Sequence, residues 1–129
     1  MKIIFNFFSL CFACLILILN NSEFSYAVSN VDWVILKENN DGKEWIDMGS
    51  IKEINAEEIT VLTKFLKNPK ESNDKEQLSL YVMRINCNEK KFKDTSINGI
   101  PQFGSKWQNS NNDELIEVVI EKSCSERIN

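Results

Sequence analysis

The stretch that decides the fold is LSLYVMRINC, at residues 78–87. It is the longest run of strand-like composition in the chain, and it ends in a cysteine. Because side chains alternate along a strand, Tyr81, Met83, Ile85 and Cys87 share one face. The pattern predicts a central strand that carries Cys87 towards a partner elsewhere in the chain.

A second ordered pattern lies near the C-terminus and predicts an α-helix. Its apolar residues recur at helical spacing and form one stripe: Leu115, Ile116, Val119, Ile120 and Cys124. We expect residues 110–112 to open the helix, with a capping box formed by Ser110 and Asp113 or by Asn111 and Glu114. Because the stripe ends in a cysteine, this helix is the predicted partner of the central strand.

Segments rich in β-branched and aromatic residues predict further strands on both sides of the central one. They are 31–38, 44–48, 57–66, 90–97 and, as a short edge strand, 103–107. The dipeptides at 41–42 and 98–99, Asp-Gly and Asn-Gly, are typical of hairpin turns, so neighbouring strands should pair antiparallel. Phe92 is expected to face inward. We therefore predict an α+β fold, a small antiparallel β-sheet packed by one C-terminal α-helix.

One helix covers only one face of a sheet. The other face of the central strand carries Leu80 and Val82, and we expect Val34, Leu36 and Leu62 to lie on the same side. The pattern therefore predicts a partly exposed apolar surface. Such a surface is open to a partner protein, to a packed loop, or to a second copy of the chain in a homodimer.

Residues 1–27 have the organisation of a secretory signal peptide. Lys2 is followed by a long apolar run and then by a polar segment that ends in Ser-Tyr-Ala at 25–27. Small residues at the first and last of these positions suit signal peptidase. We expect cleavage after residue 27, which leaves residues 28–129 as one exported domain, in the periplasm or outside the cell.

Two alternatives to cleavage remain open. An uncleaved membrane anchor is disfavoured because the apolar run is a little short for a span of about 20 residues, and no basic cluster follows it. A lipoprotein is disfavoured because neither Cys11 nor Cys14 follows the small-residue pattern of a lipidation site. After cleavage, no stable membrane span is expected.

Cleavage would leave Cys87 and Cys124 as the two cysteines of the mature chain. An exported chain with one cysteine pair predicts a single disulfide in an oxidising compartment. Closing this loop should stabilise the domain by about 3–4 kcal/mol in the chain-entropy model. The predicted disulfide would tie the helix to the sheet.

The composition excludes most catalytic and cofactor chemistry. The chain has no histidine, which removes the usual general base and the commonest metal ligand. No phosphate-binding or dinucleotide-binding glycine motif occurs. The net charge of −4 argues against nucleic acid as a partner. We therefore predict no catalytic, cofactor-binding or metal-binding residues, and no enzyme.

Four weaker features each have a simpler explanation. Asp47 near Trp45 could suggest a glycosidase acid, and residues 39–42 a calcium loop, but a solvated acid and an ordinary turn fit better. The basic cluster at 90–93 is either a contact for an anionic partner or a solvated hairpin face. The tryptophans, at 33, 45 and 107, are expected in the core, with a sugar-binding platform as the alternative.

The mature chain resembles the bacterial surface-adhesin protein E family. The shared pattern includes Trp33, Ile46-Asp47 followed by Ser50-Ile51, the strand that ends at Cys87, the basic run 90–93, Trp107, and a terminal helix that closes on Cys124. The resemblance covers nearly all of the mature chain. It implies a small antiparallel sheet with a C-terminal helix held by the disulfide.

The resemblance also implies a non-enzymatic surface or periplasmic protein of a Gram-negative bacterium. The best-known member of the family is an adhesin that binds host matrix proteins such as vitronectin and laminin. On this basis the expected function is an exported binding protein that resembles a surface adhesin. The alternative is a periplasmic accessory, structural or inhibitor-type protein that acts on another envelope protein. No ligand-binding residue can be assigned, because no segment matches the host-binding segment of that adhesin.

Overall fold

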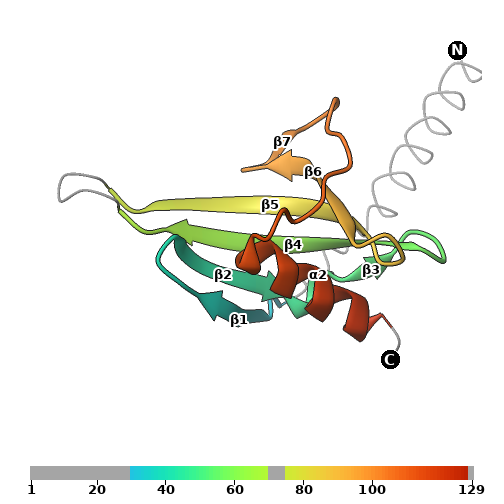
Figure 1. The fold of residues 1–129 in the computed structure, drawn as a ribbon, viewed down its shortest axis with the longest axis horizontal. Coiled ribbons are helices and arrows are strands. Elements are labelled where there is room, and N and C mark those ends of the chain that lie inside the picture. The colour runs from blue at the N-terminus through green and yellow to red at the C-terminus, as the bar shows by residue number, and fades with distance from the viewer. Residues whose placement is uncertain (1–29, 70–74, 128–129) are drawn as a thin grey trace, which may run out of the picture.

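The computed structural model describes residues 30–69 and 75–127. The predicted signal peptide at 1–27 lies outside these residues. The elements are β1 (Trp33–Glu38), β2 (Gly42–Asp47), the 3₁₀ turn η1 (Met48–Ser50), β3 (Lys52–Glu53), β4 (Glu58–Lys67), β5 (Gln77–Asn86), β6 (Lys91–Ile97), β7 (Ile100–Pro101) and α2 (Glu114–Glu126). The predicted α+β architecture, an antiparallel sheet with one C-terminal helix, is confirmed (Figure 1).

The strands form one seven-stranded antiparallel sheet in the order β1-β2-β4-β5-β6-β7, and β3 pairs with β4 next to β2. The longest pairing joins β4 and β5, from Glu58 opposite Asn86 to Lys67 opposite Gln77. The stretch at 78–87, which forms most of β5, therefore lies in the middle of the sheet, as predicted.

The two predicted hairpin turns are confirmed. Asn98 and Gly99 both have positive φ, 49° and 80°, which is the backbone geometry of a tight two-residue hairpin. Gly42 begins β2 for a different reason. A Cβ atom there would lie 2.3 Å from the carbonyl oxygen of Leu66 and 2.5 Å from the ring of Phe65, so only glycine lets β2 approach β4 this closely.

The helix begins later than predicted. Asp113 is its N-cap, and the Asp113 carboxylate accepts hydrogen bonds from the backbone N–H groups of Leu115 (2.9 Å) and Ile116 (3.3 Å). The predicted capping boxes at Ser110 and Asn111 are wrong. Asn111 and the next residue have left-handed φ angles that no helix allows, and the Ser110 hydroxyl donates instead to the Glu117 carboxylate (3.1 Å).

The predicted edge strand at 103–107 is also wrong. The sheet ends at β7, whose Pro101 has no N–H with which to continue the ladder. The chain then turns away, and Phe103 is 97% exposed. It returns beside β6 through two backbone hydrogen bonds between Phe92 and Gln108, of 3.0 and 2.8 Å.

The core lies between the sheet and α2, which crosses the face formed by β1, β2 and β4 (Figure 1). Its buried residues are Ile46, Ile59, Val61, Met83, Ile85, Phe92, Val119 and Ile120. The inward position predicted for Phe92 is therefore confirmed. The helix buries most of its predicted apolar stripe against these side chains.

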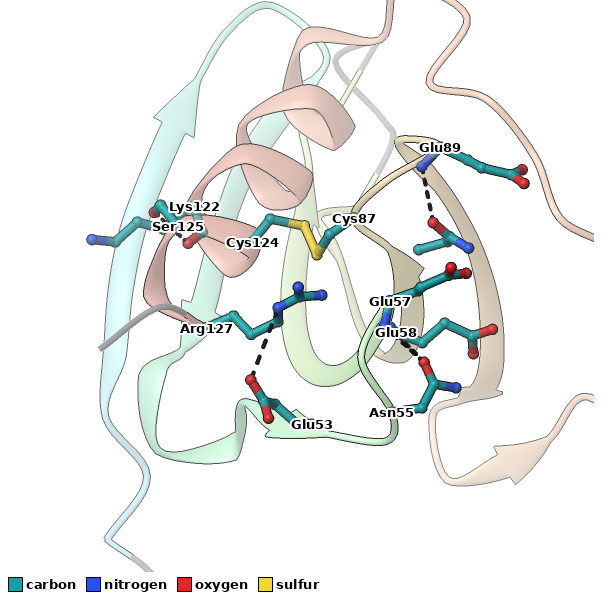
Figure 2. Close-up of a disulfide and its surroundings, with 11 residues drawn as sticks. Glu53, Asn55, Glu57, Glu58, Cys87, Glu89, Lys122, Cys124, Ser125 and Arg127 are labelled. Atoms are coloured by element: carbon teal, nitrogen blue, oxygen red, sulfur yellow. Dashed lines mark hydrogen bonds and ion pairs between the residues drawn. A yellow bond between two sulfur atoms is a disulfide. The ribbon is translucent and has the colours of Figure 1, made fainter.

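A disulfide between Cys87 and Cys124 joins the end of β5 to the last turns of α2, with 5.6 Å between the Cα atoms. Figure 2 shows this bond beside Arg127, whose guanidinium lies 3.9 Å from the Glu53 carboxylate of β3. The covalent link and this weak ion pair hold the C-terminal end of α2 over the sheet.

Candidate functional site

The face of the sheet opposite α2, called here the outer face, carries a row of large side chains. Ile35 of β1 pairs with Trp45 of β2, Trp45 with Lys64 of β4, and Lys64 with Leu80 of β5. Because Ile46 is buried on the helix side, its neighbour Trp45 and the whole row project to the other side. The row therefore crosses four strands on the uncovered side of the sheet.

Lysines stack on the tryptophans of the outer face. The Lys64 ammonium lies 4.5 Å from the ring centre of Trp33 and 4.5 Å from that of Trp45. On β6, the Lys93 ammonium lies 4.8 Å from the ring of Trp107. These are cation–π contacts, which fix the lysines and keep their charges at the surface.

The prediction that the tryptophans lie in the core is wrong. Trp33 and Trp45 are half-buried and Trp107 is 38% exposed, all on the outer face or its rim. Strand register explains this, because Trp45 lies between two residues whose side chains point towards the helix, Glu44 and Ile46. The register of a strand against its neighbours therefore decides on which face of the sheet a tryptophan lies.

The outer face is apolar, as predicted, but partly through other residues. Ile35 is 51% exposed, and Leu80 is 39% exposed. The predicted contributions of Val34 and Leu36 are wrong, because Val34 pairs with buried Ile46, and Leu36, two residues further along β1, lies on the same side and packs against the core. The predicted Leu62 and Val82 do lie opposite each other on this face, and both are half-buried.

The basic cluster at 90–93 is divided between different environments. Lys90 is exposed in the turn, with a φ of 53°. Lys91 pairs with the Glu89 carboxylate at 2.7 Å, whereas Phe92 is in the core. Lys91 and Lys93 lie on the outer face, where they pair with Asn86 and Arg84, and Lys93 also contacts Trp107.

A pocket of about 340 Å³ opens on the helix side of the sheet, beside the start of α2. Its apolar and neutral lining is Thr63, Phe65, Tyr81, Met83, Phe92, Gln108, Leu115 and Ile116. Four acids also line it: Asp41, Glu44, Asp94 and Asp113. We call it the acidic pocket. The sequence interpretation missed it, although a charged Glu44 at an inward position of β2 was a usable signal.

Glu44 dominates the electrostatics of the acidic pocket. It is 3% exposed, and this burial raises the pKa of its carboxyl to about 8. A hydrogen bond with Thr63 lowers the pKa in part, while repulsion by Asp113 and Asp94 raises it further. Burial also raises the pKa of Asp94. Glu44 is therefore mostly neutral at pH 7.

Other polar residues, including Asp47 and Asn39 from the features considered in the sequence, have structural roles. The Asp47 carboxylate accepts hydrogen bonds from the backbone N–H groups of Asp32 (2.8 Å) and Gly49 (3.1 Å), which shapes the turn after β2. The Asn39 side chain closes the β1–β2 turn by accepting from the backbone N–H of Asp41. Glu58 forms an ion pair with Arg84 on the outer face. Each group is committed to local structure.

Across residues 30–69 and 75–127, no group of three or more acids or cysteines is arranged to hold a metal ion. The same residues include no helix that is both long enough and apolar enough to cross a bilayer.

Comparison with known proteins gives one match. The model of the surface adhesin-E family matches residues 34–129, from β1 to the end of the chain. Neither the curated proteins nor the solved structures include a significant match. The matched segment contains the strands, the helix and both disulfide cysteines. The chain therefore belongs to the surface adhesin-E family.

Proposed function

We propose that this protein is an exported, non-enzymatic adhesin that binds a host extracellular-matrix protein through the outer face of its sheet. Membership of the surface adhesin-E family supports an exported or surface-located, adhesin-like protein. The row of Ile35, Trp45, Lys64 and Leu80, exposed at its two ends and half-buried between them, is the single observation that carries the choice of surface.

The chemistry of the outer face suits a protein partner. Half-exposed tryptophans and aliphatic side chains provide the apolar contact area typical of the centre of an interface. Lys64 and Lys93 add positive charge to this face, although the whole chain is acidic. The expected contact on the partner is therefore an acidic segment with exposed apolar residues.

The test is binding of the mature, disulfide-bonded chain to immobilised vitronectin and laminin. We expect saturable binding that falls at least tenfold in Ile35→Asp, because the new carboxylate would be placed among apolar side chains and would oppose an acidic partner. Ile54→Asp is the matched control, since Ile54 is similarly exposed (45%, against 51% for Ile35) but lies in the connection before β4.

Two results would contradict the proposal. One is the absence of saturable binding to either matrix protein. The other is equal binding by the Ile35→Asp and Ile54→Asp proteins, which would move the contact away from the outer face. Fractionation of the source cells adds an independent test, because an adhesin must reach the surface or the medium. Strict retention in the periplasm would favour an accessory role in the envelope.

A further inference from the structure

The geometry points to a second binding site, on the other side of the sheet from the proposed adhesive surface. We propose that the acidic pocket binds one alkylammonium group, with the ammonium at Glu44 and Asp94 and the alkyl stem against the apolar wall. This inference does not depend on the proposed function, because it concerns different residues on the opposite face.

The shape and lining of the pocket suit such a ligand. At about 340 Å³ it lies at the small end of the range for ligand sites and has room for a short alkylamine. Phe65, Tyr81 and Phe92 supply aromatic surface, which attracts cations as well as covering a hydrocarbon stem. Carboxylates and apolar walls together match a cation with an apolar stem.

Within the described part of the chain, no ion pair includes any of the four acids: Asp41, Glu44, Asp94 and Asp113. Lys37 is the cross-strand neighbour of Glu44, but its ammonium is bound to Glu114, at 2.7 Å. Glu44 is thus a carboxyl more than nine-tenths buried that lines an open pocket and forms no ion pair with the described residues.

Three elements around Glu44 add negative charge to the pocket. The turn before β2 contributes Asp41, β6 contributes Asp94, and the cap of α2 contributes Asp113. On β4, the cross-strand neighbour of Glu44 is apolar Phe65, and its hydrogen-bond partner is neutral Thr63. A bare metal ion is a poor fit, because the acids in this part of the structure form no cluster with ligand spacing. A single ammonium group needs fewer ligands and no fixed geometry.

Binding of an ammonium should release a proton. Free Glu44, with a pKa of about 8, is mostly protonated at pH 7. A cation beside it favours the carboxylate, so occupancy of the pocket lowers this pKa and expels the proton. Affinity should therefore rise as the pH increases from 6 to 8, while the amine itself stays charged. Attraction to exposed surface acids would not produce this release.

The experiment uses n-butylammonium chloride as the probe, with the mature, disulfide-bonded chain. Titration followed by NMR should shift the backbone amides of Asp94, Leu115 and Ile116 in a saturable manner. Calorimetry at pH 7 in two buffers of different ionisation enthalpy should show release of most of one proton per ligand. Neutral 1-butanol, which keeps the stem and lacks the charge, should bind at least tenfold more weakly.

Variants place the binding at the acidic pocket. Glu44→Gln should weaken butylammonium binding at least tenfold and abolish proton release. Asp94→Asn should weaken binding severalfold and provides a second test if Glu44→Gln does not fold. Glu121→Gln is the matched control, because Glu121 is exposed on α2 and makes no ion pair among the described residues.

A second arm identifies the source of the ammonium group. If a capped Gly-Lys-Gly peptide binds more tightly than butylammonium, the natural ligand is a lysine side chain of a partner protein. If the peptide binds more weakly, the natural ligand is a free amine. Either result supports the site. The proposal is overturned if no amide near the pocket shifts saturably, or if Glu44→Gln and Asp94→Asn bind as tightly as the unmodified chain.

Discussion

Glu44 lies at an inward-facing position of its strand, where apolar residues are usual. It lies on the helix side of β2, two residues before Ile46, which is fully buried. A buried carboxyl is costly when charged, and its raised pKa is the result. The protein therefore tolerates this residue by keeping it protonated over most of the physiological range.

The first prediction concerns the effect of pH on stability. Between the ordinary pKa of 4.5 and the folded value of about 8, the unfolded chain ionises Glu44 while the native chain keeps it neutral. The native state then binds more protons, so the free energy of unfolding should fall as the pH rises from 4.5 to 8, by up to about 5 kcal/mol. Asp94, whose pKa is also raised, acts in the same direction.

Urea unfolding at pH 5 and at pH 8 measures this loss. The Glu44→Gln protein should lose much less stability over the interval than the unmodified chain, whereas the exposed control Glu121→Gln should lose as much as the unmodified chain. Parallel losses in all three proteins would show that Glu44 does not titrate as described.

At the scale of elements, both ends of α2 are fixed, but by different means. The N-terminal end depends on the Asp113 cap and on the ion pair between Lys37 of β1 and Glu114, with 2.7 Å between the charged atoms. The C-terminal end is held by the disulfide. The start of the helix, which borders the acidic pocket, is therefore the end held without a covalent bond.

The second prediction tests the N-cap. Asp113→Ala should lower the free energy of unfolding by about 1 kcal/mol, because two backbone N–H groups lose their acceptor. Ser110→Ala should cost less than about 0.5 kcal/mol, because it removes only an exposed side-chain hydrogen bond. Urea unfolding at pH 6 measures both losses. At this pH Glu44 is still mostly neutral, so removing the Asp113 charge does not also relieve repulsion between Asp113 and Glu44. A larger loss of stability in Ser110→Ala than in Asp113→Ala would instead indicate that the helix begins at Ser110, as the sequence pattern predicts.

The elements themselves could be predicted because their sequence patterns are local. Alternation in 78–87 and helical spacing from Leu115 to Cys124 both correspond to the observed structure. The start of α2 could not be placed, because Asn111 takes a left-handed conformation that its residue type permits but does not require. The face on which Val34 and Leu36 lie depends on the pairing of β1 with β2, so no local pattern shows that Leu36 faces the core.

At the scale of the whole molecule, one disulfide connects the end of the central strand β5 to α2, the helix that covers one face of the sheet. Cys87 and Cys124 are 37 residues apart in sequence, so the disulfide closes a loop that includes β6, β7 and most of α2. The core between the sheet and the helix is small, and a domain of this size has little surplus stability. The disulfide should therefore supply a large share of the total.

The third prediction is the cost of removing this bond. The double variant Cys87→Ser and Cys124→Ser should lose about 3–4 kcal/mol of unfolding free energy, because the unfolded chain regains the entropy of an open loop. Chemical reduction of the unmodified chain should give a similar loss and controls for the packing of the serines. A loss below about 1 kcal/mol in both cases would show that packing alone holds α2 in place.

The two candidate surfaces differ in how far they could be predicted. An uncovered apolar face follows from having one helix and one sheet, and it was predicted. The residues that make up this face could not all be predicted, because the placement of Trp33 and Trp45 depends on the register between strands. The acidic pocket joins β2, β4, β5 and β6 to the start of α2. Groups brought together from so many elements leave no spacing pattern in the sequence.

The alternation of side chains in β2 and β4 limits how this protein can change during evolution. Glu44 and Thr63 serve the pocket, while their immediate neighbours Trp45 and Lys64 serve the outer face. Inserting or deleting a single residue in either strand would exchange the two sets, bringing tryptophan and lysine inward and the acid outward. We expect diversification in this lineage to proceed by substitution within these strands, with changes in length confined to the turns.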